Sequence, residues 1–122
     1  MVYSSQDGGT FSLGVRDSIM IAHSFHSDKF GPATQMHGAT YTVDVDFVSE
    51  SFEEDVNWVI DIGIASDLLS RVLQRYNFQN LNEVFPGENT TTEFMCRVIH
   101  KDLQSLLNDQ KCFTGKMSVK LH

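Results

Sequence analysis

The stretch HGATYTVDVDFVS, residues 37–49, decides the fold prediction because apolar and polar residues alternate along its whole length. Side chains two positions apart in a strand leave the same face of a sheet. One face therefore carries His37 with apolar and aromatic residues, and the other carries threonines and aspartates: Tyr41, Val43, Val45 and Phe47 against Thr40, Thr42, Asp44 and Asp46. This pattern predicts an antiparallel sheet with one face in water.

A second strand is predicted upstream, over Thr10–Phe25. Its inward face would hold mostly apolar residues, and it would also place His23 among them. A loop over Ser27–Gln35, which contains Gly31 and Pro32, joins the two strands. An acidic turn over Glu50–Asp55 follows the second strand.

The remainder of the chain predicts two helices and a last strand. Ile64, Leu68, Val72 and Tyr76 repeat every four residues and predict a helix over 63–76 that Asp61 would begin. A second helix would begin at Thr90, which has capping-box spacing to Glu93. A strand over Phe113–Leu121 would end the chain. The order of elements predicts an α+β fold, with two helices on one face of an antiparallel sheet.

Length and composition bound the class of protein. The chain has 122 residues and is 41% hydrophobic, which predicts one domain over residues 1–122. Its apolar runs are too short to cross a bilayer, and its two cysteines do not form a disulfide framework of the secreted kind. A cytoplasmic location is the expectation. A formal charge of -7 argues against nucleic acid or anionic membrane as a partner, which leaves a small ligand or a protein.

Four motifs, in order, resemble those of the 6-pyruvoyltetrahydropterin synthase family, which includes the bacterial 6-carboxytetrahydropterin synthases. Ile21-Ala22-His23-Ser24-Phe25 is similar to the end of the family's first strand, and Met36-His37-Gly38-Ala39-Thr40-Tyr41 resembles its His-Gly-His motif. Asn80-Leu81-Asn82 is similar to a segment between the helices, and Glu88-Asn89-Thr90-Thr91-Thr92-Glu93 resembles the run that opens the second helix. The likeness covers about Phe11 to His122.

The resemblance implies a tunnelling fold, in which the sheets of several subunits join into a barrel as trimers that stack into hexamers. Ligand sites would lie between subunits of this homo-oligomer. The family reaction converts dihydroneopterin triphosphate at zinc held by three histidines. Zinc with an open position polarises a hydroxyl or carbonyl of the substrate. In the family, a cysteine and an Asp-His pair transfer the protons of this reaction.

This chain departs from the family pattern at several of those positions. Ala39 stands where the third zinc ligand belongs, and no cysteine occurs in the loop Lys29–Met36. Asn77-Phe78-Gln79 replaces the Asp-His pair, and neither amide relays a proton as histidine does. The family's anchoring glutamate follows the last Val-x-Val strand, but here the chain ends at His122. We therefore expect a domain that lacks the last strand.

The candidate site residues follow from the matched motifs. His23 and His37 are the predicted metal ligands for zinc, and His26 is a possible third donor if the backbone bends. A donor from a neighbouring subunit is the alternative. Thr91, Thr92 and Glu93 are the predicted pterin-binding residues, because a carboxylate matches the donors on the 2-amino-pyrimidinone edge. A helix cap alone also explains the threonines.

Two functional hypotheses follow from this pattern of retained and lost residues. The first is a synthase-like enzyme that acts on or binds a reduced pterin, such as dihydroneopterin triphosphate, at a metal site between subunits. The second is a catalytically reduced oligomer that binds a pterin or purine. The missing thiol and Asp-His pair predict that the synthase reaction itself is weak or absent.

Overall fold

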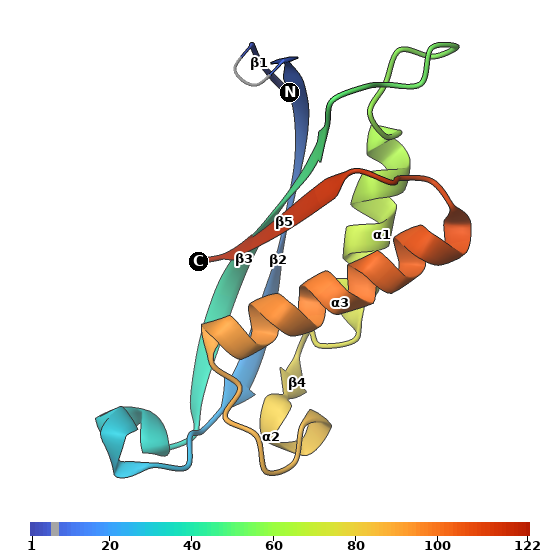
Figure 1. Cartoon of the computed structure of the whole chain (residues 1–122). Coiled ribbons are helices and arrows are strands. Elements are labelled where there is room, and N and C mark those ends of the chain that lie inside the picture. The colour runs from blue at the N-terminus through green and yellow to red at the C-terminus, as the bar shows by residue number, and fades with distance from the viewer. Residues whose placement is uncertain (6–7) are drawn as a thin grey trace.

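The computed structural model describes residues 1–5 and 8–122, and its centre is an antiparallel sheet (Figure 1). Within these residues the strand order is β1-β2-β3-β5, and a short parallel strand, β4, also pairs with β2. The bounds are Val2–Ser4 for β1, Thr10–His23 for β2, His37–Ser49 for β3, Gln79–Asn80 for β4 and Lys116–Leu121 for β5. The predicted sheet is confirmed.

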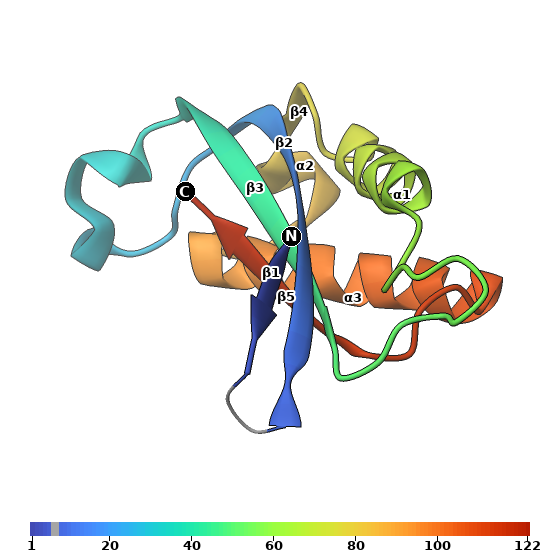
Figure 2. The ribbon, with the colours of Figure 1, turned by 90° about the horizontal axis from the view of Figure 1, so that it is seen from above.

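Three α-helices and a 3₁₀ segment complete the described structure. They are α1 (Ile62–Gln74), α2 (Leu81–Val84), α3 (Thr92–Gln110) and η2 (Asp28–Thr34). Figure 2 shows α1 beside the C-terminal half of α3, with η2 at the opposite flank of the molecule. No helix in the described part of the chain has the length and apolar character that a membrane crossing requires.

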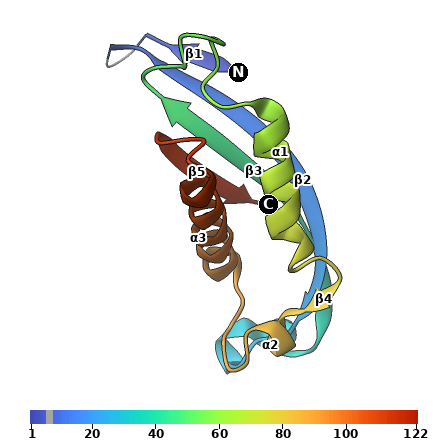
Figure 3. The same cartoon turned by 90° about the vertical axis from the view of Figure 1, so that its right-hand side faces the viewer.

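β2 and β3 form the longest ladder, which pairs Phe11 with Ser49 at one end and His23 with His37 at the other. Figure 3 shows that both strands bend along their length, from β1 at one end to η2 and α2 at the other. The register places the predicted inward faces of the two strands on the same side of the sheet. The two histidines therefore lie opposite each other, at the end nearest η2 and α2.

The core lies between that inward face and the two long helices. Val43, Val45 and Phe47 are fully buried on β3, and Leu69, Val72 and Ile99 of α1 and α3 are buried against the same core. The alternate residues Arg16, Asp46 and Met20 are exposed on the other face. The one wet face predicted from the alternation is thus confirmed.

The predicted start is confirmed for α1 and differs from the structure for α3. Asp61 is the N-cap of α1 and accepts hydrogen bonds from the backbone N–H groups of Gly63 and Ile64, as predicted. The N-cap of α3 is Thr91, whose hydroxyl accepts from the N–H of Phe94, so the predicted start at Thr90 is wrong by one residue. Thr90 is fully buried, and its hydroxyl is hydrogen-bonded to the ring of His23 instead of capping the helix.

Strand ends also differ from the prediction, and hydrogen bonding explains one of them. β2 stops at His23 instead of Phe25, because the N–H of Ser24 donates to the side chain of Asn82. The last strand begins at Lys116, since Phe113 is a buried core residue that precedes it. β1, β4 and α2 were not predicted; each is four residues or fewer, too short for a periodic pattern.

Candidate ligand site at the histidine end of the sheet

His23 and His37 form a cross-strand pair at the end of the sheet. Their ring centroids are 4.6 Å apart, and the rings meet edge to face. His23 is only 2% exposed, whereas His37 is half-buried. The last residue of β2 and the first residue of β3 thus bring together the two predicted metal ligands.

Each imidazole is held by its Nδ1 atom. Nδ1 of His37 lies 2.9 Å from the backbone carbonyl oxygen of Gln35. A carbonyl only accepts, so this nitrogen carries the proton and Nε2 of the neutral ring keeps its lone pair. Nδ1 of His23 lies 2.9 Å from the hydroxyl oxygen of Thr90. Partners on Nδ1 are the usual means by which proteins orient metal-binding imidazoles.

The environment of His23 favours its neutral form. Burial is the main cause that lowers the pKa of its imidazole, and the nearby His37 lowers it further. The hydrogen bond with Thr90 acts in the opposite direction. A neutral imidazole is the form that binds a metal ion or accepts a hydrogen bond.

Two asparagines fix the backbone that follows His23. The side-chain oxygen of Asn82 accepts from the N–H of Ser24 at 3.1 Å, and its amide nitrogen donates to the Ser24 hydroxyl at 2.7 Å. Asn89 accepts from the backbone N–H of His26 at 2.7 Å. The Asn80-Leu81-Asn82 motif therefore serves here as a brace for the end of β2.

Aromatic rings cover the histidine pair on the side of η2. The ring of Phe25 lies 4.6 Å from that of His23 and 4.5 Å from that of Phe30, measured between centroids. It also lies 5.8 Å from His37. Phe25 therefore lies beside both histidines, and Phe30 packs against it from the η2 segment.

A surface pocket of about 390 Å³ adjoins the start of α3. Its lining includes Thr91 and Glu93, together with Asn89, Phe94 and Arg97. The hydroxyl of Thr92 donates to the Glu93 carboxylate at 3.4 Å. Two of the three predicted pterin-binding residues therefore face one pocket, and the third contacts one of them.

The structure does not bring a third metal donor to the pair within one chain. Among the described residues, no group of three or more histidine, cysteine, aspartate or glutamate side chains is arranged to hold a metal ion. His26 is exposed, and its backbone is held by Asn89. Ala39 lies opposite Ile21, two positions along the same face from His37. The pair alone fits a metal as two ligands of a larger set, so metal binding remains a proposal.

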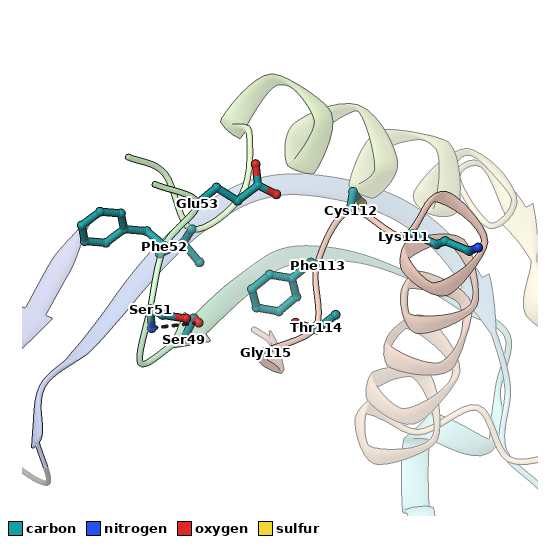
Figure 4. Close-up of a pocket in the computed structure, with 10 residues that line it drawn as sticks. Ser49, Ser51, Phe52, Glu53, Lys111, Cys112, Phe113, Thr114 and Gly115 are labelled. Atoms are coloured by element: carbon teal, nitrogen blue, oxygen red, sulfur yellow. Dashed lines mark hydrogen bonds between the residues drawn. The ribbon is translucent and has the colours of Figure 1, made fainter. Parts of the chain in front are cut away.

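Pockets elsewhere on the surface do not belong to this site. Figure 4 shows a pocket of about 170 Å³ at the far end of the sheet, between the segment after β3 and the segment before β5. Ser49, Glu53, Lys111 and Phe113 are among its lining residues. Burial raises the pKa of the Cys112 thiol there, which makes it a poor nucleophile.

Residues that the sequence did not assign to the site contribute much of its geometry. The Thr90 hydroxyl bonds the His23 ring, and the side chains of Asn82 and Asn89 accept from the backbone that follows it. The ring of Phe25 lies beside the two histidines and contacts that of Phe30. A run of three threonines indicates the start of a helix. Nothing in the run shows that Thr90 is the threonine that hydrogen-bonds an imidazole. The pairing of Ser24 with Asn82 joins residues 58 positions apart, which no local pattern reveals.

The chain is similar to proteins of one family over most of its length. The family model described as 6-pyruvoyl tetrahydropterin synthase matches residues 12–120. A solved 6-pyruvoyl tetrahydropterin synthase from Caenorhabditis elegans has a TM-score of 0.74 at 21% identity, over 93% of this chain and 94% of that one. The corresponding structure from Plasmodium falciparum has a TM-score of 0.62 at 14% identity, over 93% and 98%. No curated protein sequence matches the chain. At these identities the two structures support the fold alone.

Proposed function

Because the chain belongs to the 6-pyruvoyl tetrahydropterin synthase family, we propose that it binds a reduced pterin, such as dihydroneopterin triphosphate, at the histidine end of its sheet. The observation that carries the proposal is that the matched His23 is joined directly to the segment before α3. Thr90 bonds His23, and its neighbour Thr91 lines the pocket that Glu93 also lines. This connection between the end of β2 and the start of α3 supports the proposal.

In the proposed complex, the Glu93 carboxylate accepts hydrogen bonds from the amino group and ring N–H of the pterin. His23 and His37 would hold the metal, for which zinc is the expectation. A metal there would polarise an oxygen of the bound side chain. The residues of this chain would orient the ring, and Phe25 lies beside both imidazoles.

The site is completed between subunits of a homo-oligomer, a trimer or a hexamer. Within residues 1–5 and 8–122, one chain brings together only two of the three protein ligands that a catalytic zinc site uses, and its pocket at α3 lies open at the surface. Strand edges that a neighbour would cover are also present. The outer edge of β5 has no strand beside it among the described residues, and exposed edges are unfavourable in a stable sheet.

A second candidate function, a pterin- or purine-binding oligomer without synthase activity, is favoured by one observation. Asn77 and Phe78 stand at the place of the proton-relaying pair, and the Asn77 side chain is occupied as acceptor for the N–H of Met20 at 3.0 Å. Phe78 has no ionisable group. We predict that turnover of dihydroneopterin triphosphate is weak or absent.

Metal content and ligand binding of the purified protein test these proposals. Stoichiometric zinc in the wild type that is lost in His37→Ala would support the metal site, and Gln35→Ala serves as a control that keeps the backbone carbonyl. Saturable binding of dihydroneopterin that Glu93→Gln weakens would support the pterin site. A wild-type protein that contains no zinc and binds no dihydroneopterin would contradict the proposed function. Turnover at rates typical of enzymes would contradict the second candidate alone.

A further inference from the structure

Arg97 is the basic residue of the pocket at the start of α3, which it lines together with Glu93 and Phe94. Its side chain is exposed and takes part in no ion pair or hydrogen bond among the described residues. Glu93 lies one helical turn before it, a spacing at which opposite charges on a helix often pair. Because no ion pair joins the two, the guanidinium keeps its donors available for a group that enters the pocket.

The helical turn that carries these two charged side chains is fixed from both sides. The hydroxyl of Thr91 accepts from the N–H of Phe94 at 3.2 Å, and the ring of Phe94 meets that of Phe85 edge to face at 5.2 Å. Phe85 in turn stacks on Tyr76 at 5.7 Å, and the Tyr76 hydroxyl donates to Asp102 further along α3. The pocket is therefore held in place by contacts within the chain, before any ligand binds.

A pterin presents four polar groups in sequence along one edge. The 2-amino group and the ring N–H are donors, and the carbonyl oxygen O4 and the ring nitrogen N5 follow as acceptors. A carboxylate only accepts, and a guanidinium only donates, through a planar fork of N–H groups. The same fork recognises the adjacent acceptors O6 and N7 of guanine in nucleic acids. One carboxylate and one guanidinium side by side thus complement the whole edge.

The spacing of the two side chains on α3 suits this edge. Residues four apart on a helix have Cβ atoms about 5–6 Å from each other, which is comparable to the length of the edge. Glu93 and Arg97 line the same pocket, so both can reach one ligand from the same side. The other lining residues, Asn89, Thr91 and Phe94, carry no charge that competes with them.

We propose that Arg97 donates hydrogen bonds to O4 and N5 of the pterin while Glu93 accepts from its amino group and ring N–H. This inference rests on the proposed function, which places Glu93 on the pterin. The pair then selects the 2-amino-4-oxo edge in its 7,8-dihydro form, in which N5 has a lone pair. A tetrahydropterin carries a hydrogen on N5, and a 4-amino analogue carries an amino group in place of O4. Each of these ligands turns a donor towards the guanidinium.

A phosphate group is the other partner that an exposed arginine takes. The pocket does not favour it, because the carboxylate of Glu93 lies one turn from Arg97 and would repel a polyanion. A guanidinium that binds the ring, in contrast, gains from the neighbouring carboxylate, since both hold the same edge. The two assignments differ in which part of the ligand the arginine recognises, so binding measurements separate them.

Anaerobic calorimetry with three probes tests the selection: 7,8-dihydroneopterin, 5,6,7,8-tetrahydroneopterin and the 2,4-diamino analogue of the former. The wild type should bind the first about tenfold or more tightly than either of the others. Arg97→Gln should lose most of this preference, and Arg97→Lys should recover only part of it, because lysine keeps the charge without the fork. Arg71→Gln, at an exposed arginine of α1, is the matched control and should keep the preference. Thermal unfolding shows whether each variant is folded.

An unchanged preference in Arg97→Gln would overturn the inference, even if the variant were less stable, because Arg97 would then serve the helix alone. Weaker binding of dihydroneopterin triphosphate by Arg97→Gln, with dihydroneopterin itself unaffected, would assign the arginine to phosphate and also overturn it. A wild type that binds all three probes equally would overturn this inference and leave the proposed function standing. A wild type that binds no pterin would overturn both.

Discussion

The Thr90 hydroxyl oxygen lies 2.9 Å from Nδ1 of His23, a residue 67 positions earlier in the chain, and the two side chains are buried together. This bond ties the segment before α3 to the end of β2. It also fixes the orientation of a predicted metal ligand from the same segment that lines the predicted pterin pocket.

Thr90→Val should destabilise the protein by about 1–3 kcal/mol, because a buried imidazole nitrogen loses its partner while the volume is kept. Urea unfolding measures the change. Thr40→Val, on the exposed face of β3, is the control and should change stability by less than about 0.5 kcal/mol. Equal midpoints for the two variants would show that the Thr90 bond is not needed.

Asn82→Leu should cost about 1–3 kcal/mol and loosen the end of β2, since the N–H and hydroxyl of Ser24 both lose their partner. Hydrogen exchange of the Ser24 and Phe25 amides should accelerate more than that of β3 amides. Asn108→Ala, which loses only an exposed bond from Gln104, is the control. Unchanged exchange at Ser24 would refute the bracing role.

Asp44 predicts a pH dependence of stability. Hydrogen bonds from Arg16 and His122 hold the pKa of its carboxyl at about 2, below its ordinary value of 3.8. The unfolded chain therefore takes up this proton first as the pH falls. The stabilisation by Asp44 is present above about pH 4 and is lost as the pH falls towards 2. The urea midpoint of the wild type should exceed that of Asp44→Asn at neutral pH and converge with it in acid. A constant difference across that range would contradict this.

Gly115→Ala should destabilise by about 1–3 kcal/mol, since overpacking forces the neighbours to move. A Cβ there would collide with the Val48 carbonyl oxygen and lie 2.6 Å from the ring of Phe113, which Figure 4 shows beside it. Gly38→Ala is the matched control, because its Cβ would approach only the Ile21 carbonyl, at 3.8 Å. Thermal unfolding of both variants gives the comparison, and similar losses at the two positions would refute the steric argument.

Phe78→Asn should raise stability by about 0.5–1 kcal/mol, because asparagine tolerates the left-handed conformation and the phenyl ring buries little. Lys111→Gly, at a second residue with positive φ, should act in the same direction. Urea unfolding measures both. A loss of stability in Phe78→Asn alone would mean that the ring packs within its own chain.

Much of the fold could be predicted from the sequence because its long elements have clear periods. The alternation in residues 37–49 gave β3 with both ends correct, and the four-residue repeat gave α1 to within two residues. The C-terminal end of β2 and the start of α3 depend on bonds between distant residues, Ser24 with Asn82 and His23 with Thr90. Such bonds leave no local signal.

The candidate site was predictable to a similar extent. The resemblance named His23 and His37, and the register of the sheet places them opposite each other. The resemblance could not show that the exposed His26 does not join the two histidines. Nor could it show that Phe25 lies beside them and packs against Phe30. Both depend on the path of η2, where Gly31 interrupts the helical geometry with φ of 55°.

The bracing of residues 23–26 by Asn82, Asn89 and Thr90 has a consequence for the order of folding. His23 and His37 are joined by a short connection, so their pairing closes a small loop at little entropic cost. The three braces close loops of 58 to 67 residues and require α1 and α2 to be in place. During synthesis, the histidine pair can therefore form before the pocket beside α3 exists.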